Sequence, residues 1–253
     1  MVKRDVQPLP EPPADCRACP LRQLELFAPS DDDDHERLRS IRGRTHRLKH
    51  GEIIHSEGDA VTRAFTLFDG YAIRYRTLAS GERQVLQFMM SGDLLCHLEG
   101  GSRDWPDTAE VVGYAVLCSL SAPGLQALFE NGIRMAHQIA EIRRTEMLLL
   151  EELMMDMGQQ SAFDGVARLL LELFLREHER GRTRGNRCFF PFRQKDIGDA
   201  LSLSSVHISR VYADLRDSDL MSIDNRWLTI PDRERAMKRL DYEPSYLRVR
   251  PLL

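Results

Sequence analysis

The sequence predicts an α+β fold in three successive parts: an antiparallel β-roll, a long helix, and a helix-turn-helix followed by a hairpin wing. Glycines recur every 11 or 12 positions from Gly58 to Gly92 among short β-like runs. A long amphipathic pattern of period 3.6 follows Pro123. Two short helical patterns on either side of residues 202–204 are then followed by alternating apolar residues around Asp224-Asn225. These changes of hydrophobic period separate sheet from helix.

The length of the chain allows two domains, and its charged residues are unevenly distributed between the N-terminal and C-terminal parts. The chain has 253 residues and a net charge of −4. Residues 1–158 carry 18 Lys/Arg against 25 Asp/Glu, and residues 159–253 carry 17 against 14, so that −7 and +3 sum to −4. This balance argues against a protein that coats nucleic acid by charge alone. The C-terminal part is therefore the better candidate for contact with nucleic acid.

The N-terminal residues 1–28 are expected to be a flexible, cysteine-containing segment. The first 13 residues are rich in proline and contain no apolar signal core, and no apolar run in the chain reaches a membrane-spanning length. We therefore expect no membrane association and a cytoplasmic protein. In such a chain five cysteines do not indicate a disulfide framework, and Cys16-Arg-Ala-Cys19 indicates a metal or redox element instead.

Residues 29–123 are expected to form the β-roll, a sensor domain of the kind that encloses small ligands. A short helix starts it, with Ser30 as its expected cap and an acidic first turn. Each glycine of the repeat can take φ > 0 at a corner, and turn signals at this spacing are typical of an antiparallel sandwich or jelly roll. The β-like runs cover residues 52–56, 64–68, 71–76, 84–88 and 115–120.

Residues 124–158 are expected to form a single dimerisation helix. An apolar seam of mostly three- and four-residue steps indicates a helix that needs a partner. Packing of this seam against the β-roll of the same chain is the alternative. The expected dimer residues are Met135, Ile139, Ile142, Leu149, Leu153 and Met157.

Residues 159–253 are expected to form the winged helix-turn-helix domain. A helix over Ala162–Glu179 leads through a basic segment, residues 180–187, which either contacts phosphate or is an ordinary solvated loop. Ile197, Ala200 and Leu201 then mark one short helix, and Val206, Val211 and Leu215 mark the apolar stripe of a second. Small Ala200 is expected to let the two helices approach closely.

The second short helix is predicted to be a recognition helix for DNA. Short hydroxyls, an imidazole and an arginine suit base edges and phosphates in the major groove. Any antiparallel helix pair in a core shows the same period, which is the alternative interpretation. Arg226, near the tip of the predicted hairpin, is expected to lie beside the phosphate backbone. The expected DNA-binding residues are Ser204 (which also caps the helix), Ser205, Val206, His207, Ser209, Arg210 and Arg226.

From about Cys16 to about Asp232 the chain resembles the CRP/FNR family of bacterial transcription regulators. The most specific pieces are the glycine-punctuated roll ending in Gly92-Asp-Leu-Leu and the segment from Ile197-Gly198 to Arg210. The resemblance implies a homodimer that binds a palindromic promoter site in double-stranded DNA and contacts RNA polymerase. It also implies that Arg210 contacts guanine or phosphate and that Ser209 contacts a base.

This chain departs from the family pattern at two positions of the helix-turn-helix. Val206 stands where family members carry a cytosine-reading Glu, so we expect a different DNA site, in which an apolar side chain meets a thymine methyl group. Ser202 stands at a turn position that is often Gly.

The resemblance also allows a prediction of whether the β-roll binds a cyclic nucleotide. Cyclic-nucleotide binders of the family use an Arg-Ser/Thr-Ala motif whose Arg pairs with the cyclic phosphate, and the matching run here is Asp107-Thr108-Ala109. A carboxylate at this position repels phosphate, so cyclic AMP is not the expected ligand.

FNR-like members hold a [4Fe–4S] cluster on N-terminal cysteines and one central cysteine. By this resemblance Cys16, Cys19 and Cys118 are expected metal ligands, and Glu25 stands at the remaining N-terminal cysteine position. Because these clusters favour thiolates, either Cys96 or Glu25 is the expected fourth ligand. The alternative is that Cys96 and Cys118 are ordinary core residues of apolar strands.

The predicted function is therefore a dimeric DNA-binding regulator that responds to oxygen or redox state through a cluster or through thiols. A regulator of the same family without a cofactor, controlled by its abundance or by an unknown ligand, is the first alternative. A cyclic-nucleotide-binding regulatory protein is the second. The chain has no G-x-G-x-x-G loop, no second C-x₂-C and no evident catalytic set, so we do not expect an enzyme.

Overall fold

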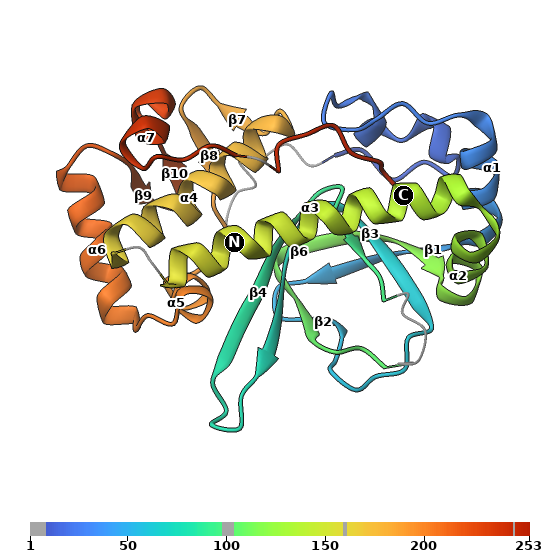
Figure 1. Cartoon of the computed structure of the whole chain (residues 1–253), viewed down its shortest axis with the longest axis horizontal. Helices are drawn as coiled ribbons and strands as arrows, with labels where there is room; N and C mark the ends of the chain where they lie inside the picture. Colours follow the sequence, from blue (N-terminus) through green and yellow to red (C-terminus); the bar gives the residue numbers. More distant parts are fainter. Residues whose placement is uncertain (1–8, 98–103, 159–160, 245) are drawn as a thin grey trace. The chain divides into compact units, whose positions relative to one another are not determined.

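A computed structural model describes residues 9–97, 104–158, 161–244 and 246–253 and confirms the α+β class. The chain packs into two units, and Figure 1 shows its elements in sequence order. The β-roll unit contains the described residues between 7 and 76, those between 88 and 146, and residues 248–253. The helix-turn-helix unit contains the described residues of 77–87 and 147–247. These units do not follow the consecutive ranges expected from the sequence, because residues 77–87 and 248–253 each pack with a distant part of the chain.

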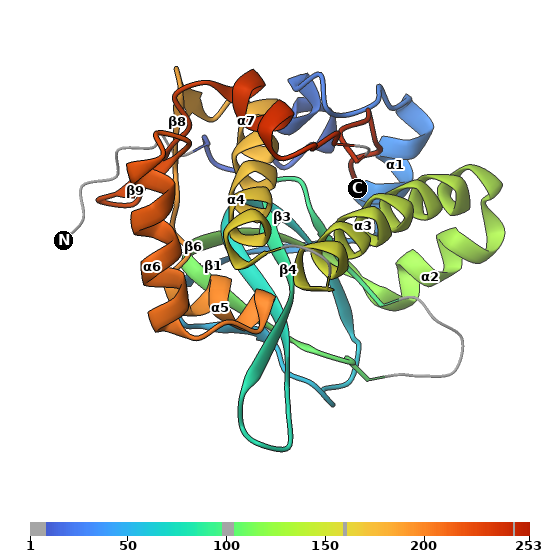
Figure 2. The same cartoon turned by 60° about the vertical axis from the view of Figure 1, so that its left-hand side comes forward.

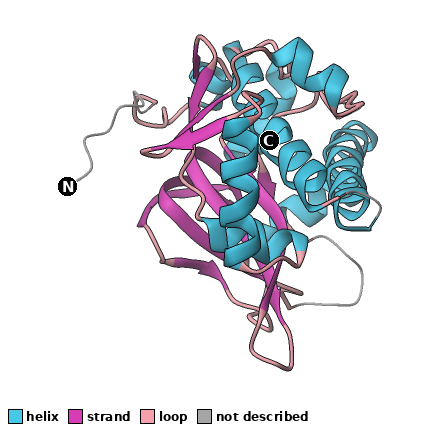
Figure 3. Ribbon diagram, turned by 90° about the vertical axis from the view of Figure 1, so that its left-hand side faces the viewer, coloured by secondary structure: helices cyan, strands magenta, loops and turns pink. Residues whose placement is uncertain are grey.

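An antiparallel sheet forms the β-roll unit, and its strands are magenta in Figure 3. The main path runs β1-β6-β3-β4, with β2 paired to β6 and β5 paired to β3. Much of its core is apolar and includes Phe65, Leu67 and Val111. The strands are β1 (Arg42–Lys49), β2 (Ile53–His55), β3 (Arg63–Thr77), β4 (Arg83–Met90), β5 (Leu94–Leu95) and β6 (Thr108–Ser121).

The corner expected at Asp69-Gly70 is a bulge inside one long strand. The two runs predicted as separate strands belong to β3, whose pairing with β6 shifts register at Leu67/Asp69 and at Gly70/Ala72. Gly70 has φ +105°, and a Cβ there would lie 2.0 Å from the carbonyl oxygen of Tyr114. Only glycine permits this approach of two strands.

The described part of the N-terminal segment is packed, which corrects the expectation of flexibility for residues 9–28. Two short 3₁₀ helices, Cys16–Ala18 and Pro20–Gln23, lie in it. Leu21, Leu26 and Phe27 are buried in a cluster with Phe68, and this apolar contact fixes the segment to the roll. Helix α1 (Asp32–Ile41) follows, capped by Asp31 rather than by Ser30.

The helix expected over residues 124–158 is broken in two, as Figure 2 shows. Helix α2 (Ala122–Asn131) ends at Gly132, and α3 (Ile133–Gly158) continues from there. Gly132 has extended backbone angles, which interrupt the helical hydrogen bonds. Among the described residues, no helix combines the length and apolar character needed to cross a membrane.

Four helices and a small sheet complete the helix-turn-helix unit. Helix α4 has the predicted bounds, Ala162–Glu179. Buried Arg168 on α4 bonds Asp156 (2.7 Å) on α3 and the carbonyl oxygen of Leu240 (3.0 Å). The sheet has the order β7-β8-β10-β9. The remaining elements are β7 (Thr183–Arg184), β8 (Arg187–Phe189), α5 (Gln194–Leu201), α6 (Ser205–Asp217), β9 (Ser222–Asp224), β10 (Trp227–Thr229) and α7 (Arg233–Arg239).

Candidate nucleic-acid interface and thiol cavity

Helices α5 and α6 form the predicted helix-turn-helix. Ser204 caps α6 as expected, because its Oγ accepts a hydrogen bond from the backbone N–H of His207 at 3.3 Å. Ser202 ends α5 in the left-handed conformation, with φ 56° and ψ 36°. This conformation explains why glycine is common at such a turn position.

Gly198 allows the close approach of the two helices, a role that sequence reasoning gave to Ala200. A Cβ on Gly198 would lie 2.5 Å from the carbonyl oxygen of Leu203 and 3.6 Å from Cγ1 of Ile208. Ile208 is buried between the helices, whereas Val206, which sequence reasoning included in the apolar stripe, is 62% exposed. In the sequence, the glycine that directly follows apolar Ile197 was the feature that could have indicated the close approach of α5 and α6.

The N-terminal face of α6 is exposed while its other face is buried. Ile208, Val211 and Leu215 are buried, and α6 packs against α4 and α5. The exposed side chains therefore project outward from a helix whose orientation is fixed by its core. All the predicted residues of this helix and its cap are exposed: Ser204, Ser205, Val206, His207, Ser209 and Arg210.

The predicted wing is a β-hairpin in which a two-residue turn joins β9 to β10. Asn225 and Arg226 form its turn with φ 48° and 66°, as a type I′ connection requires. The carbonyl oxygen of Arg226 accepts a hydrogen bond from the N–H of Phe190 at 2.8 Å, which ties the wing to β8. The Arg226 side chain is exposed at the hairpin tip.

The basic segment 180–187 divides into internal and exposed arginines. Arg180 is buried, and Arg182 is paired with Glu177 at 3.6 Å. Arg184 and Arg187 are exposed, and their guanidinium carbons lie 5.6 and 4.9 Å from the centre of the Trp227 ring. These two arginines are thus the exposed arginines of the segment, and both lie beside a ring of the wing.

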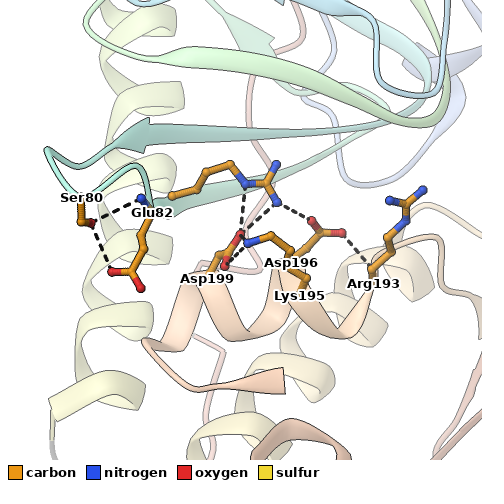
Figure 4. A network of polar contacts seen from close by, with 7 residues as sticks. Ser80, Glu82, Arg193, Lys195, Asp196 and Asp199 are labelled. Carbon is orange, nitrogen blue, oxygen red and sulfur yellow. Dashed lines mark hydrogen bonds and ion pairs between the residues drawn. The ribbon is translucent and has the colours of Figure 1, made fainter. Parts of the chain in front are cut away.

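The strands β3 and β4 end in a hairpin that holds α5, as Figure 4 shows. Arg83 on β4 bonds Asp196 (3.1 Å) and Asp199 (2.9 Å), which lie one turn apart on α5. Gln84 donates to the carbonyl oxygen of Ala200 at 3.0 Å. A single guanidinium thus fixes the first helix of the pair from a strand more than a hundred residues away in sequence.

The predicted dimer residues are mostly buried inside the chain. Met135, Ile139 and Ile142 pack in the core of the β-roll unit, and Leu149 and Leu153 are also buried. This burial agrees with the alternative of packing within one chain, and of the six predicted residues only Met157 is exposed. A different stripe of α3 is open to solvent: Met147, Leu150, Met154 and Met157.

Asp107 is buried in an internal ion network. Its carboxylate accepts hydrogen bonds from His55 Nε2 (2.9 Å) and from Arg74 Nε (3.1 Å). Burial alone raises the pKa of Asp107, but the hydrogen bonds from His55 and Arg74 and the charge of Arg74 outweigh it and lower the pKa to about 2. The Trp105 ring stacks on His55 at 3.7 Å. A residue engaged in this way holds negative charge in the roll rather than binding an anion.

Three cysteines line one small cavity of the β-roll unit. Cys16, Cys19 and Cys118 surround a free space of about 40 Å³, together with Arg22 and Arg42. Arg42 bonds Cys16 Sγ (3.6 Å) and Cys118 Sγ (3.8 Å). Burial raises the pKa of the Cys19 thiol, and it raises that of Cys118 to about 11. Both thiols are therefore protonated at neutral pH in this arrangement.

The cavity does not fit a [4Fe–4S] cluster as it stands. Its free space of about 40 Å³ is room for a few water molecules and is smaller than a cluster of four iron and four sulfur atoms. Cys96 is buried elsewhere, beside Arg143 (Nη2 to Sγ 3.2 Å), and exposed Glu25 does not line the cavity. Among the described residues no group of three His, Cys, Asp or Glu is placed to hold a metal ion. Three thiols converge, but a fourth ligand and room for a cluster do not accompany them.

Two known domains match the chain in the order of its structural parts. The cyclic nucleotide-binding domain matches residues 45–131, and the Crp-like helix-turn-helix domain matches residues 166–238. The first lies on the β-roll, and the second spans α4 to α7.

Whole-chain relatives agree with this order. The transcriptional activatory protein AadR of Rhodopseudomonas palustris is 25% identical over 232 residues, covering 88% of this chain and 90% of that protein. The transcriptional activator protein FnrA of Stutzerimonas stutzeri is 24% identical, covering 87% and 89%. The structure of FixK2 from Bradyrhizobium japonicum shares the fold, with a TM-score of 0.67 at 20% identity, covering 79% of this chain and 98% of that one. The chain thus belongs to the CRP/FNR family of DNA-binding transcription regulators.

Proposed function

We propose that the protein is a dimeric regulator that reads a two-fold symmetric promoter site through α6. The single observation that carries this proposal is the exposed N-terminal face of α6 above a buried face that fixes its orientation. An N-terminal face of this kind is the part of a recognition helix that reaches base edges. A regulator of this type acts where promoter DNA is, so the proposal includes a cytoplasmic location and contact with RNA polymerase.

Each exposed residue has a role that follows from its chemistry. Arg210 has no ion-pair partner among the described residues, and it is the cation available for guanine or phosphate. Ser209 can bond a base edge, and Val206 can contact a thymine methyl group. Arg226 at the wing tip is suited to phosphate, which positions the domain without reading sequence.

The test compares Arg210→Ala with Arg216→Ala, a matched control in the last turn of the same helix. Duplexes are first selected from a random-sequence pool with the unaltered protein, and dissociation constants are then measured on the selected site at several salt concentrations. We expect a palindromic site and a loss of about 1–3 kcal/mol for Arg210→Ala, with little change for Arg216→Ala. Equal losses for the two variants, or no selected sequence at all, would contradict the proposal.

The dimer is proposed to form through the exposed stripe of α3. Met147, Leu150, Met154 and Met157 follow one another at separations of three, four and three residues, which is the repeat of a two-stranded coiled coil. Their side chains are exposed in a single chain, whereas five of the six residues first expected in this role are buried within it. An exposed apolar stripe of this length is costly in water unless a second helix covers it.

A redox response through thiols is the second candidate function, favoured by the convergence of Cys16, Cys19 and Cys118 on one cavity. The bonds of Arg42 to two of these sulfurs join the cavity to β1, so a change at the thiols can reach the sheet. The relatives with FNR-type names support this candidate by analogy only. If DNA binding by the Cys19→Ser variant responded to a mild oxidant as the unaltered protein does, the candidate would fail and a regulator without a cofactor would remain.

A further inference from the structure

The last six residues of the chain, which we call the C-terminal strap (residues 248–253), lie along the N-terminal segment of the β-roll unit. Phe27 and Arg250 form a parallel bridge. The N–H of Arg250 donates to the carbonyl oxygen of Leu26 at 3.0 Å, and the N–H of Ala28 donates to that of Arg250 at 2.8 Å. The strap is thus bound as an extended peptide, by main-chain hydrogen bonds of the kind that add a strand to an edge.

Arg250 anchors the strap in the roll. Its side chain is buried, and Nη2 lies 2.6 Å from Oδ1 of Asp93. Its guanidinium carbon lies 5.6 Å from the centre of the Phe27 ring. Asp93 is itself held by the N–H of Met90 at 2.9 Å, so the carboxylate is fixed in place for the arginine.

The two leucines that follow enter the wall of the thiol cavity. Leu252 and Leu253 are buried and line the cavity with Cys16, Cys19 and Cys118. Leu252 belongs to the apolar cluster against which Cys19 and Cys118 pack. Arg22 donates to the carbonyl oxygen of Leu252 at 3.2 Å, and the hydroxyl of Thr66 donates to that of Leu253. The strap therefore occupies the space that a ligand of the thiols would need.

We propose that the C-terminal strap is the resident occupant of the thiol cavity and controls access to its cysteines. Cys19 and Cys118 are half-buried while the strap is bound, and its leucines limit the access of reagents, oxidants and soft metal ions to both sulfurs. Two main-chain hydrogen bonds and the buried side chains of Arg250, Leu252 and Leu253 hold the strap, and the opening of such a segment costs less free energy than the unfolding of the whole unit. This inference does not depend on the DNA-binding proposal, and it accounts for the small free space beside three thiols.

The test measures alkylation of each cysteine by N-ethylmaleimide in the full chain, followed by mass spectrometry of peptides. One variant carries Leu252→Ser and Leu253→Ser, and its control carries Val249→Ser, because Val249 is 61% exposed in the same strap. We expect alkylation of Cys19 and Cys118 to be at least about tenfold faster in the double variant and unchanged in the control.

Cys188 serves as an internal reference, because it is buried in β8 of the helix-turn-helix unit. Its rate should not change in either variant. A second variant, Arg250→Met, leaves both leucines in place but removes the anchor. It should accelerate the alkylation of Cys19 and Cys118 in the same way. Unchanged rates at these two cysteines, or an equal acceleration at Cys188 that reports loss of the whole fold, would overturn the proposal.

Discussion

Single side chains decide what the β-roll unit can bind, and Asp107 is the clearest example. The resemblance to cyclic-nucleotide binders of the family places it where those proteins carry an arginine. His55 and Arg74 bind its carboxylate inside the roll and balance its negative charge there. To admit a cyclic phosphate at this position, the unit would have to break a buried pair and place two anions together, and both steps are unfavourable.

Asp107 stabilises the fold in its ionised form. Because its pKa in the fold is lowered to about 2 from an ordinary 3.8, the stabilisation by the ionised carboxylate is complete above pH 3.8 and is lost as the pH falls towards 2. Asp107→Asn should reduce the free energy of unfolding by about 3 kcal/mol at neutral pH. Its urea midpoint should also vary less between pH 4 and pH 2 than that of the unaltered protein.

Asp217→Asn provides the comparison, since Asp217 is exposed at the end of α6. It should leave the midpoint nearly unchanged, as surface substitutions usually do. An Asp107→Asn protein as stable as this control, with the same acid dependence as the unaltered protein, would show that the network contributes no stability.

The turn between α5 and α6 joins two elements at a small cost in backbone strain. Gly198 gives the space for the crossing, whereas Ser202 adopts a left-handed conformation that its Cβ disfavours. The strain is tolerated because Ser202 stands at the end of a helix that Arg83 and Gln84 hold from the β3–β4 hairpin.

Ser202→Gly should therefore stabilise the protein, by about 1 kcal/mol. The hydroxyl of Ser202 bonds Gln84 at 3.3 Å, but this bond is exposed and contributes less than the strain removes. The measurement is the urea midpoint, with Ser205→Gly in the first turn of α6 as the control. The control should be destabilising by about 0.5 kcal/mol, because glycine is a poor helix former. A loss of stability in both variants would show that Ser202 is unstrained.

At the scale of the whole molecule, α3 serves two surfaces at once. One face is buried in the core of the chain, and the stripe from Met147 to Met157 is exposed and is the proposed dimer surface. Two apolar faces on one helix explain why the sequence alone could not decide which of them dimerises.

Met154→Glu should convert the proposed dimer into monomers and weaken binding to a palindromic site, because it places a charge in the centre of the seam. Met154 is 64% exposed in a single chain, and Met155, 50% exposed on another side of the helix, gives the control Met155→Glu. Sedimentation velocity at several protein concentrations distinguishes monomer from dimer. A Met154→Glu protein that remained dimeric would rule out this seam.

The sequence predicted the features that depend on neighbouring residues. The bounds of α4 and the cap at Ser204 follow from local signals, and the structure agrees with both, whereas the turn expected around Asp224-Asn225 lies one residue later, at Asn225-Arg226. It did not predict the break at Gly132 or the partners of Asp107, which come from distant strands. The cysteines were grouped by family resemblance, and no local pattern indicated that Leu252 would lie beside them.

The contact of Arg83 with α5 has a practical consequence for anyone who wishes to study the DNA-binding part alone. A fragment beginning near residue 161 would contain the complete helix-turn-helix and its wing but not the hairpin of residues 77–87. Asp196 and Asp199 would then lose the guanidinium that they share and repel each other on one face of a short helix. The recognition machinery is therefore not a detachable module, and fusion proteins or NMR fragments should retain the strands that carry Arg83.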